Sequence, residues 1–240
     1  MVTDYDIDFL AVGDKTSGDA IFIRTIDPIN GEIINLVDGG YSGTADNIKL
    51  FMEKWYKRKK EIDNMILTHG DNDHISGLIK IIEENKIKVK NLWAIFPWEY
   101  AQDLILGNYF SNRNSINWLE NELKRAYPKL KKLEELARER QITIKTPFKN
   151  SQIGLFKVLS PSKEFYLDNI ASSAKTAEEN SNSNSNRAGK NSLNQSFQVQ
   201  RILQHHLKNG VTKNFHLRVH HLRTIIASFN SLPLNQIKYY

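Results

Sequence analysis

One short segment, Thr68 to His74 (THGDNDH), constrains this chain more than any other. It places two histidines and two aspartates within six positions, after the apolar run Met65 to Leu67 and before Ser76 to Ile79, which reads as the start of a helix. A strand end that turns tightly into a helix is where open α/β sheets place their ligands. Imidazole nitrogens and carboxylate oxygens are ligands that zinc, iron and manganese accept. The segment therefore predicts an α/β fold with a metal site at a strand end.

The order of the ligand types within the segment suits two metal ions rather than one. In a turn, alternate side chains can converge on one point while their neighbours serve a second point nearby. The candidate metal ligands are His69, Asp71, Asp73 and His74. A solvated turn is the competing interpretation, because Asp and Asn often hydrogen-bond their own backbone there. The strand-turn-helix context together with four potential ligands favours the metal site.

Composition narrows the class of protein. The chain has 240 residues, enough for one sizeable α/β domain. It has no cysteine, so disulfides and thiolate metal sites are excluded. The acidic N-terminus has no apolar signal-peptide region, and no run approaches the roughly 18 apolar residues of a membrane span. We expect a cytoplasmic protein with no membrane partner, and the sequence does not indicate an oligomeric state.

Charge divides the chain into unlike parts. Residues 1–179 hold all 27 acidic residues and 25 of the 33 basic ones, whereas residues 180–240 hold eight basic residues and no acid. Within that second part, the Asn/Ser tract at residues 180–186 cannot bury apolar surface and predicts a linker. We therefore expect a domain over residues 1–170, an Asn/Ser-rich linker over 171–200 and a basic, His-rich tail of uncertain structure over 201–240.

Hydrophobic periodicity predicts alternating strands and helices in the first domain. Strands are expected at Ile7–Val12, Ala20–Thr25, Glu32–Val37, Met65–Thr68, Ile87–Ile95, Ile142–Thr146 and Leu155–Leu159. Helices are expected from Thr44 to about Lys57 and after His74. Residues 115–140 have helical spacing that Pro128 should split or kink. We interpret this helical insertion as amphipathic helices packed on the core, with a lid or partner surface as the alternative.

Thr68 to Gly77 resembles the metal-binding signature of the metallo-β-lactamase-fold hydrolases. The usual form has a second histidine where this chain has Asp71. An aspartate at that position resembles the branch that includes the hydrolase domain of the competence protein ComEC. Three further stretches are similar to that branch and extend the resemblance over about residues 5–165. They are Asp8 to Arg24 (DFLAVGDKTSGDAIFIR), Leu36 to Gly40 (LVDGG), and Leu92-Trp93 with Pro97-Trp98.

The resemblance implies a four-layer αββα sandwich and a hydrolase with two divalent metal ions, zinc first, with manganese or iron as alternatives. His69 and Asp71 would hold one ion, and Asp73 and His74 the other. Asp73 would also be the catalytic residue that orients the attacking water. The substrate would be a phosphodiester, of a small molecule or a nucleic acid, or an ester-like compound. Four residues, Asp38, Gly39, Gly40 and Gly77, would have structural roles near the site, as would Gly70.

Two parts of the family pattern are missing, so the fold should be incomplete at its C-terminal end. The pattern has a later Thr-Gly-Asp-like turn that bridges both metals, but no aspartate follows Asp168 here. It also has a final histidine. The tail holds five of the seven histidines, but none has the expected neighbours; they are His205, His206, His216, His220 and His221.

Three interpretations stay open at this point. The chain is an active hydrolase of this fold, a truncated or frame-disrupted member with little or no activity, or a nucleic-acid-binding protein that uses its basic tail against phosphates.

Overall fold

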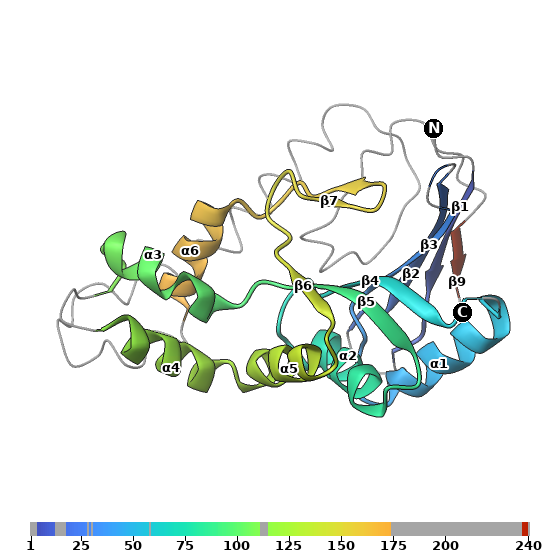
Figure 1. Cartoon of the computed structure of the whole chain (residues 1–240), viewed down its shortest axis with the longest axis horizontal. Helices are drawn as coiled ribbons and strands as arrows, with labels where there is room; N and C mark the ends of the chain where they lie inside the picture. The colour runs from blue at the N-terminus through green and yellow to red at the C-terminus, as the bar shows by residue number, and fades with distance from the viewer. Residues whose placement is uncertain are drawn as a thin grey trace.

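The computed structural model describes residues 4–12, 18–27, 29, 31–57, 59–110, 115–173 and 237–239. Strands and helices alternate in these residues around one large sheet (Figure 1). The strands are β1 (Asp4–Phe9), β2 (Ile21–Asp27), β3 (Gly31–Val37), β4 (Glu61–Ile66), β5 (Lys88–Trp93), β6 (Thr143–Lys145), β7 (Gln152–Ile153), β8 (Phe156–Lys157) and β9 (Ile237–Tyr239). The helices are α1 (Thr44–Trp55), α2 (Asn72–Glu84), the short 3₁₀ helix η1 (Pro97–Tyr100), α3 (Ala101–Leu106), α4 (Ile116–Ala126), α5 (Pro128–Glu139) and α6 (Lys163–Ser172).

The main sheet has seven strands in the order β6-β5-β4-β3-β2-β1-β9. Strands β3, β4, β5 and β6 are parallel to one another, whereas β2 is antiparallel to both β1 and β3. The C-terminal ends of the four parallel strands therefore meet at one edge of the sheet. In α/β sheets this is the edge at which ligands bind.

Helices cover one face of this sheet. Side chains alternate along a strand, so in β3 the buried Ile34 and Leu36 belong to the helix-covered core, whereas Val37 faces the other way. Helices α1, α2 and α5 lie together on this side, below the sheet in Figure 1. Their buried residues, such as Phe51 and Leu78, join the same core. Burial of these apolar faces is the main stabilising contribution to the helix layer.

The opposite face of the sheet carries a smaller apolar cluster under the β7–β8 hairpin. Ile153 and Val158 of the hairpin segment pack with Val37, Ile66 and Trp93 of the sheet. The fold is thus mixed α/β with a central sheet and helices, as predicted. In the described residues, the second sheet of the expected four-layer sandwich consists of this two-stranded hairpin.

Most expected elements are present, with shifted ends. The run at 115–140 is split as predicted, since α4 ends at Ala126 and α5 begins at Pro128. Leu119, Leu123, Leu130, Leu133 and Ala137 are buried in the core, whereas Ile116 and Trp118 are exposed. The strand expected at 155–159 is present but shorter, as β8, and a turn through Gly154, with φ +55°, pairs it with β7 in a hairpin.

Five elements were not expected from the sequence: η1, α3, β7, α6 and β9. Helix α6 extends to Ser172, past the expected domain boundary at residue 170. Its apolar residues do not share one face, because Phe165 is exposed while Leu167 and Ile170 are buried. At the other end of the chain, residues 237–239 of the His-rich tail form β9, parallel to β1. The expected linker from 174 onward and the five tail histidines lie outside the described residues.

No helix in the described part of the chain is both long and apolar enough to cross a bilayer.

Direct backbone contact joins the start of α2 to the turn after β3. The Gly39 amide donates to the His74 carbonyl at 2.8 Å, and the Gly77 amide donates to the Gly40 carbonyl at 3.0 Å. A Cβ on Gly77 would lie 1.8 Å from the Gly39 carbonyl oxygen, so no other residue fits there without movement. The predicted structural role of these three glycines is therefore a close approach of two backbones.

We expect Gly77→Ala to lower the free energy of unfolding by at least about 2 kcal/mol, because the added methyl group forces α2 away from the Gly39–Gly40 turn. The matched control is Gly43→Ala, since nothing lies within 4 Å of a Cβ at Gly43. Urea denaturation followed by circular dichroism gives both values. Equal stabilities for the two variants would contradict the close contact.

Candidate metal centre

The candidate site forms where two neighbouring parallel strands end. Asp38 directly follows β3, and the segment from Thr68 to His74 follows β4. The last residues of these strands, Val37 and Ile66, are paired in register. The Asp38 amide continues the ladder by donating to the Ile66 carbonyl at 2.8 Å. Adjacent parallel strands therefore bring Asp38 to the loop that carries all four predicted ligands.

Helix α2 begins inside this loop. Its N-cap is Asp71, with an extended backbone (φ −77°, ψ 153°), and the amides of His74 and Ile75 both donate to the Asp71 carbonyl at 3.0 Å. Asp73 lies in the first turn, where the helix dipole favours a negative charge. The helix start thus places Asp71, Asp73 and His74 within one turn of each other.

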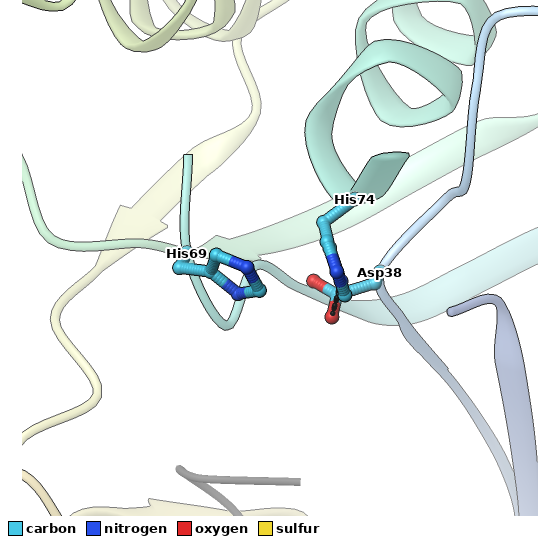
Figure 2. A group of neighbouring side chains, drawn as sticks. All are labelled: Asp38, His69 and His74. Carbon is cyan, nitrogen blue, oxygen red and sulfur yellow. Dashed lines mark hydrogen bonds and ion pairs between the residues drawn. The ribbon is translucent and has the colours of Figure 1, made fainter. Parts of the chain in front are cut away.

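Asp38 is the buried centre of the hydrogen bonds around the site. It is 1% exposed and has φ 56°, in the left-handed region. Its Oδ1 accepts from the Thr68 amide at 2.9 Å, and its Oδ2 accepts from the Thr68 hydroxyl at 2.5 Å. Its Oδ2 also lies 2.8 Å from Nδ1 of His74, which is 1% exposed (Figure 2). A buried carboxylate is stable here because hydrogen bonds reach both of its oxygens.

The rings of the two histidines lie directly beside each other, next to this carboxylate. Their ring centroids are 4.0 Å apart, and Figure 2 shows both rings beside Asp38. Nδ1 of His69 lies 2.9 Å from the Thr68 hydroxyl oxygen. On the other side of each ring, Nε2 of His69 lies 3.5 Å from Oδ2 of Asp71, and Nε2 of His74 lies 3.6 Å from Oδ2 of Asp73.

These distances divide the predicted ligands into two pairs, His69 with Asp71 and His74 with Asp73. Two ligands on one tetrahedral zinc, each about 2.0–2.1 Å from the metal, lie about 3.3 Å apart. Each pair is close to that separation, and imidazole with carboxylate is a donor set for zinc, manganese or iron. The residues present therefore fit the start of a site for two divalent ions.

The surroundings of His74 favour a positive charge beside it. Burial lowers the pKa of His74, but the Asp38 hydrogen bond and the charges of Asp38, Asp73 and Asp19 outweigh it, so the pKa lies above the ordinary value. A divalent cation is a charge of the same sign. The acidic environment that raises this pKa is thus also one that attracts a metal ion.

The structure brings together the predicted residues to different degrees. His69 and His74, together with Asp38, offer ligand atoms that all lie within 4.8 Å of one another. Asp73 lies at the edge of this group, and Asp71 points outward with 63% of its side chain exposed. Asp38 was predicted as a structural residue near the site. Its hydrogen bonds to Thr68 and His74 support that role, although its oxygens also lie within reach of a metal.

Two residues of the site were not singled out from the sequence. Thr68 connects Asp38 to His69, and the available signal was a hydroxyl residue directly before the first histidine. Lys129 of α5 donates to the Ser76 hydroxyl of α2 at 2.8 Å, and its neighbour Leu130 lies 3.2 Å from the position of a Cβ on Gly70. No sequence pattern indicated that α5 would pack against the metal loop.

Comparison with known proteins found one family whose matched residues include the candidate site. Residues 13–123 match the family model described as the metallo-beta-lactamase superfamily. No curated protein matches the chain. Among solved structures, the chain is similar to the "hydrolase AbOPH in beta lactamase superfamily", with 15% identity and a TM-score of 0.31. That match covers 61% of this chain and half of the other.

The stretch that matches the family model, residues 13–123, contains both Asp38 and the whole loop from Thr68 to His74. The candidate site thus lies within the stretch that is similar to the metallo-beta-lactamase superfamily.

Proposed function

We propose that this chain is a divalent-metal hydrolase of the ComEC-type branch, with phosphodiesters as its substrate class and zinc as its metal. The pairing of each histidine Nε2 with a different carboxylate oxygen, at 3.5 and 3.6 Å, carries the proposal. Asp71 at the position of the usual second histidine supports the branch. A cytoplasmic location stays a prediction.

Each residue of the site has a definite part in this proposal. His69 and Asp71 would hold one ion, and Asp73 and His74 would hold the other. Bound divalent metals of this kind lower the pKa of water and polarise a phosphoryl oxygen. The carboxylate of Asp73 would also accept a hydrogen bond from the attacking water and so orient it. Asp38 holds His74 by Nδ1, which directs Nε2 toward the metal position.

The position of Lys129 supports a phosphodiester over a neutral ester. Helices α2 and α5 run side by side in the same direction, because Lys129 contacts Ser76 near their starts and Arg140, just after α5, contacts the Glu83 carbonyl near their ends. The first turn of α5 therefore lies at the edge of the sheet that carries the metal loop. Among the described residues, Lys129 forms no ion pair with a carboxylate. Its charge can therefore contact an anionic substrate.

A frame-disrupted chain is the second interpretation, and two observations favour it. Residues 180–240 contain no acid, and the bridging aspartate that the family pattern requires is missing while the first metal loop is intact. A shift of reading frame near codon 180 explains both together. Such a chain would keep the two ligand pairs and lose the rest of the site.

Metal binding should depend on the loop. We expect purified protein to carry zinc or manganese, and His69→Ala or Asp73→Ala to lower its metal affinity at least about tenfold, because each removes one member of a ligand pair. Elemental analysis after dialysis measures the content. Glu135→Ala, an exposed acid on α5, is the control and should keep the wild-type content. The same metal content in all variants would end the proposal.

Lys129→Gln should raise KM for bis(p-nitrophenyl) phosphate about fivefold, the effect of one partly exposed charge pair. It should change KM for p-nitrophenyl acetate less than about twofold, because that ester carries no charge. The control is Lys131→Gln, since Lys131 lies on the same helix but pairs with Glu135 at 3.6 Å. Equal changes for both substrates, or for both lysines, would argue against a phosphodiester.

The coding DNA distinguishes a disrupted chain from an intact one. If the frame shifted, one of the other two forward frames downstream of codon 180 should encode an apolar strand followed by Thr-Gly-Asp, and a later strand that ends in histidine. Translation of those frames is the measurement. If neither frame encodes them, the tail is native to this protein and the missing ligands must be sought among its five histidines.

A nucleic-acid-binding protein is the third interpretation, and the outcome that would favour it is salt-dependent binding to any DNA without a metal requirement.

A further inference from the structure

Thr68 makes two different hydrogen bonds to one carboxylate. Its backbone amide donates to Oδ1 of Asp38 at 2.9 Å, and its hydroxyl lies 2.5 Å from Oδ2 of the same residue. Nδ1 of His74 lies 2.8 Å from that same Oδ2. The hydroxyl of Thr68 also lies 2.9 Å from Nδ1 of His69. Four groups are therefore connected in sequence: His69, the Thr68 hydroxyl, Asp38 and His74.

The number of protons available in these contacts determines which group donates in each hydrogen bond. A carboxylate only accepts hydrogen bonds, and a hydroxyl has a single proton to donate. The Thr68 proton is therefore used in the bond to Asp38, so the contact to His69 is made with the proton on Nδ1 of His69. In the same way, His74 donates its Nδ1 proton to Asp38. In the neutral form of each ring, Nε2 is then the nitrogen with a lone pair.

We propose that Thr68 is a positioning residue that extends the effect of Asp38 from one site histidine to the other. Through its hydroxyl, one buried carboxylate sets the tautomer of both His69 and His74 and directs both Nε2 atoms toward Asp71 and Asp73. The metal role of those atoms rests on the proposed function. The tautomers rest on the hydrogen bonds alone.

This arrangement makes the two ligand pairs unequal in their dependence on Thr68. Loss of the hydroxyl leaves the bond between His74 and Asp38 in place, so the pair of His74 and Asp73 is kept. The pair of His69 and Asp71 loses the hydrogen bond that orients its imidazole. Loss of the Asp38 charge, in contrast, affects both histidines. A purely structural role of Thr68 at the strand end would need only its backbone amide, which every substitution except proline retains.

Three variants separate these roles. Thr68→Val removes the hydroxyl and keeps the shape, Thr68→Ser keeps the hydroxyl, and Asp38→Asn removes the carboxylate. The first readout is two-bond ¹H–¹⁵N NMR of metal-free protein with ¹⁵N-labelled histidine at mildly alkaline pH, which identifies the protonated ring nitrogen. We expect Nδ1–H for both histidines in the wild type and in Thr68→Ser. In Thr68→Val, His69 alone should change toward the mixture of an exposed imidazole, and in Asp38→Asn both should change.

The second readout is a zinc titration followed by calorimetry. We expect Thr68→Val to weaken one of two metal equivalents about 10- to 100-fold, the usual effect of losing a group that orients a ligand. Thr68→Ser should stay within about threefold of the wild type. Weakening of both equivalents by equal factors in Thr68→Val would overturn the unequal dependence.

The two readouts keep this proposal separate from the proposed function. If the tautomer of His69 responds to Thr68→Val but no variant binds zinc, the positioning role holds and the hydrolase proposal fails. If zinc binds but the His69 tautomer is the same in the wild type and Thr68→Val, the positioning role is overturned. The same holds if wild-type His69 carries its proton on Nε2.

Discussion

The candidate site depends on one close contact between two backbones. The first turn of α2 lies so near the turn after β3 that a Cβ on Gly77 would be 1.8 Å from the Gly39 carbonyl oxygen. Two hydrogen bonds, from Gly39 to His74 and from Gly77 to Gly40, fix the approach. Because His74 is part of this contact, its side chain is brought directly beside Asp38. A bulkier turn would separate the carboxylate from the imidazole that it orients. The glycines therefore keep Asp38 within hydrogen-bonding distance of His74.

The buried carboxylate of Asp38 follows from the same contact. An isolated charge at 1% exposure would be strongly unfavourable, and it is tolerated here because three hydrogen bonds reach it from Thr68 and His74. Its charge is thereby held close to both imidazoles, in a medium that screens it less than water does. The raised pKa of His74 is one result. Attraction of a divalent cation to the same place is the expected second result.

The closeness of the four candidate ligands could be predicted from the sequence because local spacing determines it. His69, Asp71, Asp73 and His74 are near one another in the chain, so any strand-turn-helix path keeps them close in space, and their roles as metal ligands stay a prediction. The part of Thr68 was not predictable, because it depends on Asp38, which is 30 residues away and reaches the loop only through the pairing of β3 with β4. The packing of α5 on Gly70 was missed for the same reason. The strand expected at 155–159 is present as the short β8, and its hairpin partner β7 was missed because the turn through Gly154 was not identified.

The segments that follow the other two parallel strands, β5 and β6, supply no further metal ligands, so a loop that binds metal need not form a complete catalytic site. A catalytic zinc usually has three protein ligands, and each pair described here supplies two. Strands β5 and β6 end at the same edge as β3 and β4, so their following segments are the nearest places for further ligands. Yet residues 94–98 (AIFPW) and 146–148 (TPF) contain no histidine, aspartate or glutamate. Phe96 and Trp98 are buried in the core instead. Two further carboxylates act on His74 within the described residues, Asp38 and Asp19, and the oxygens of Asp38 already accept hydrogen bonds from Thr68 and His74. A third ligand for either pair must therefore come from one of these two acids, from water, from substrate or from the part of the chain outside the described residues, and tight metal binding depends on that third ligand.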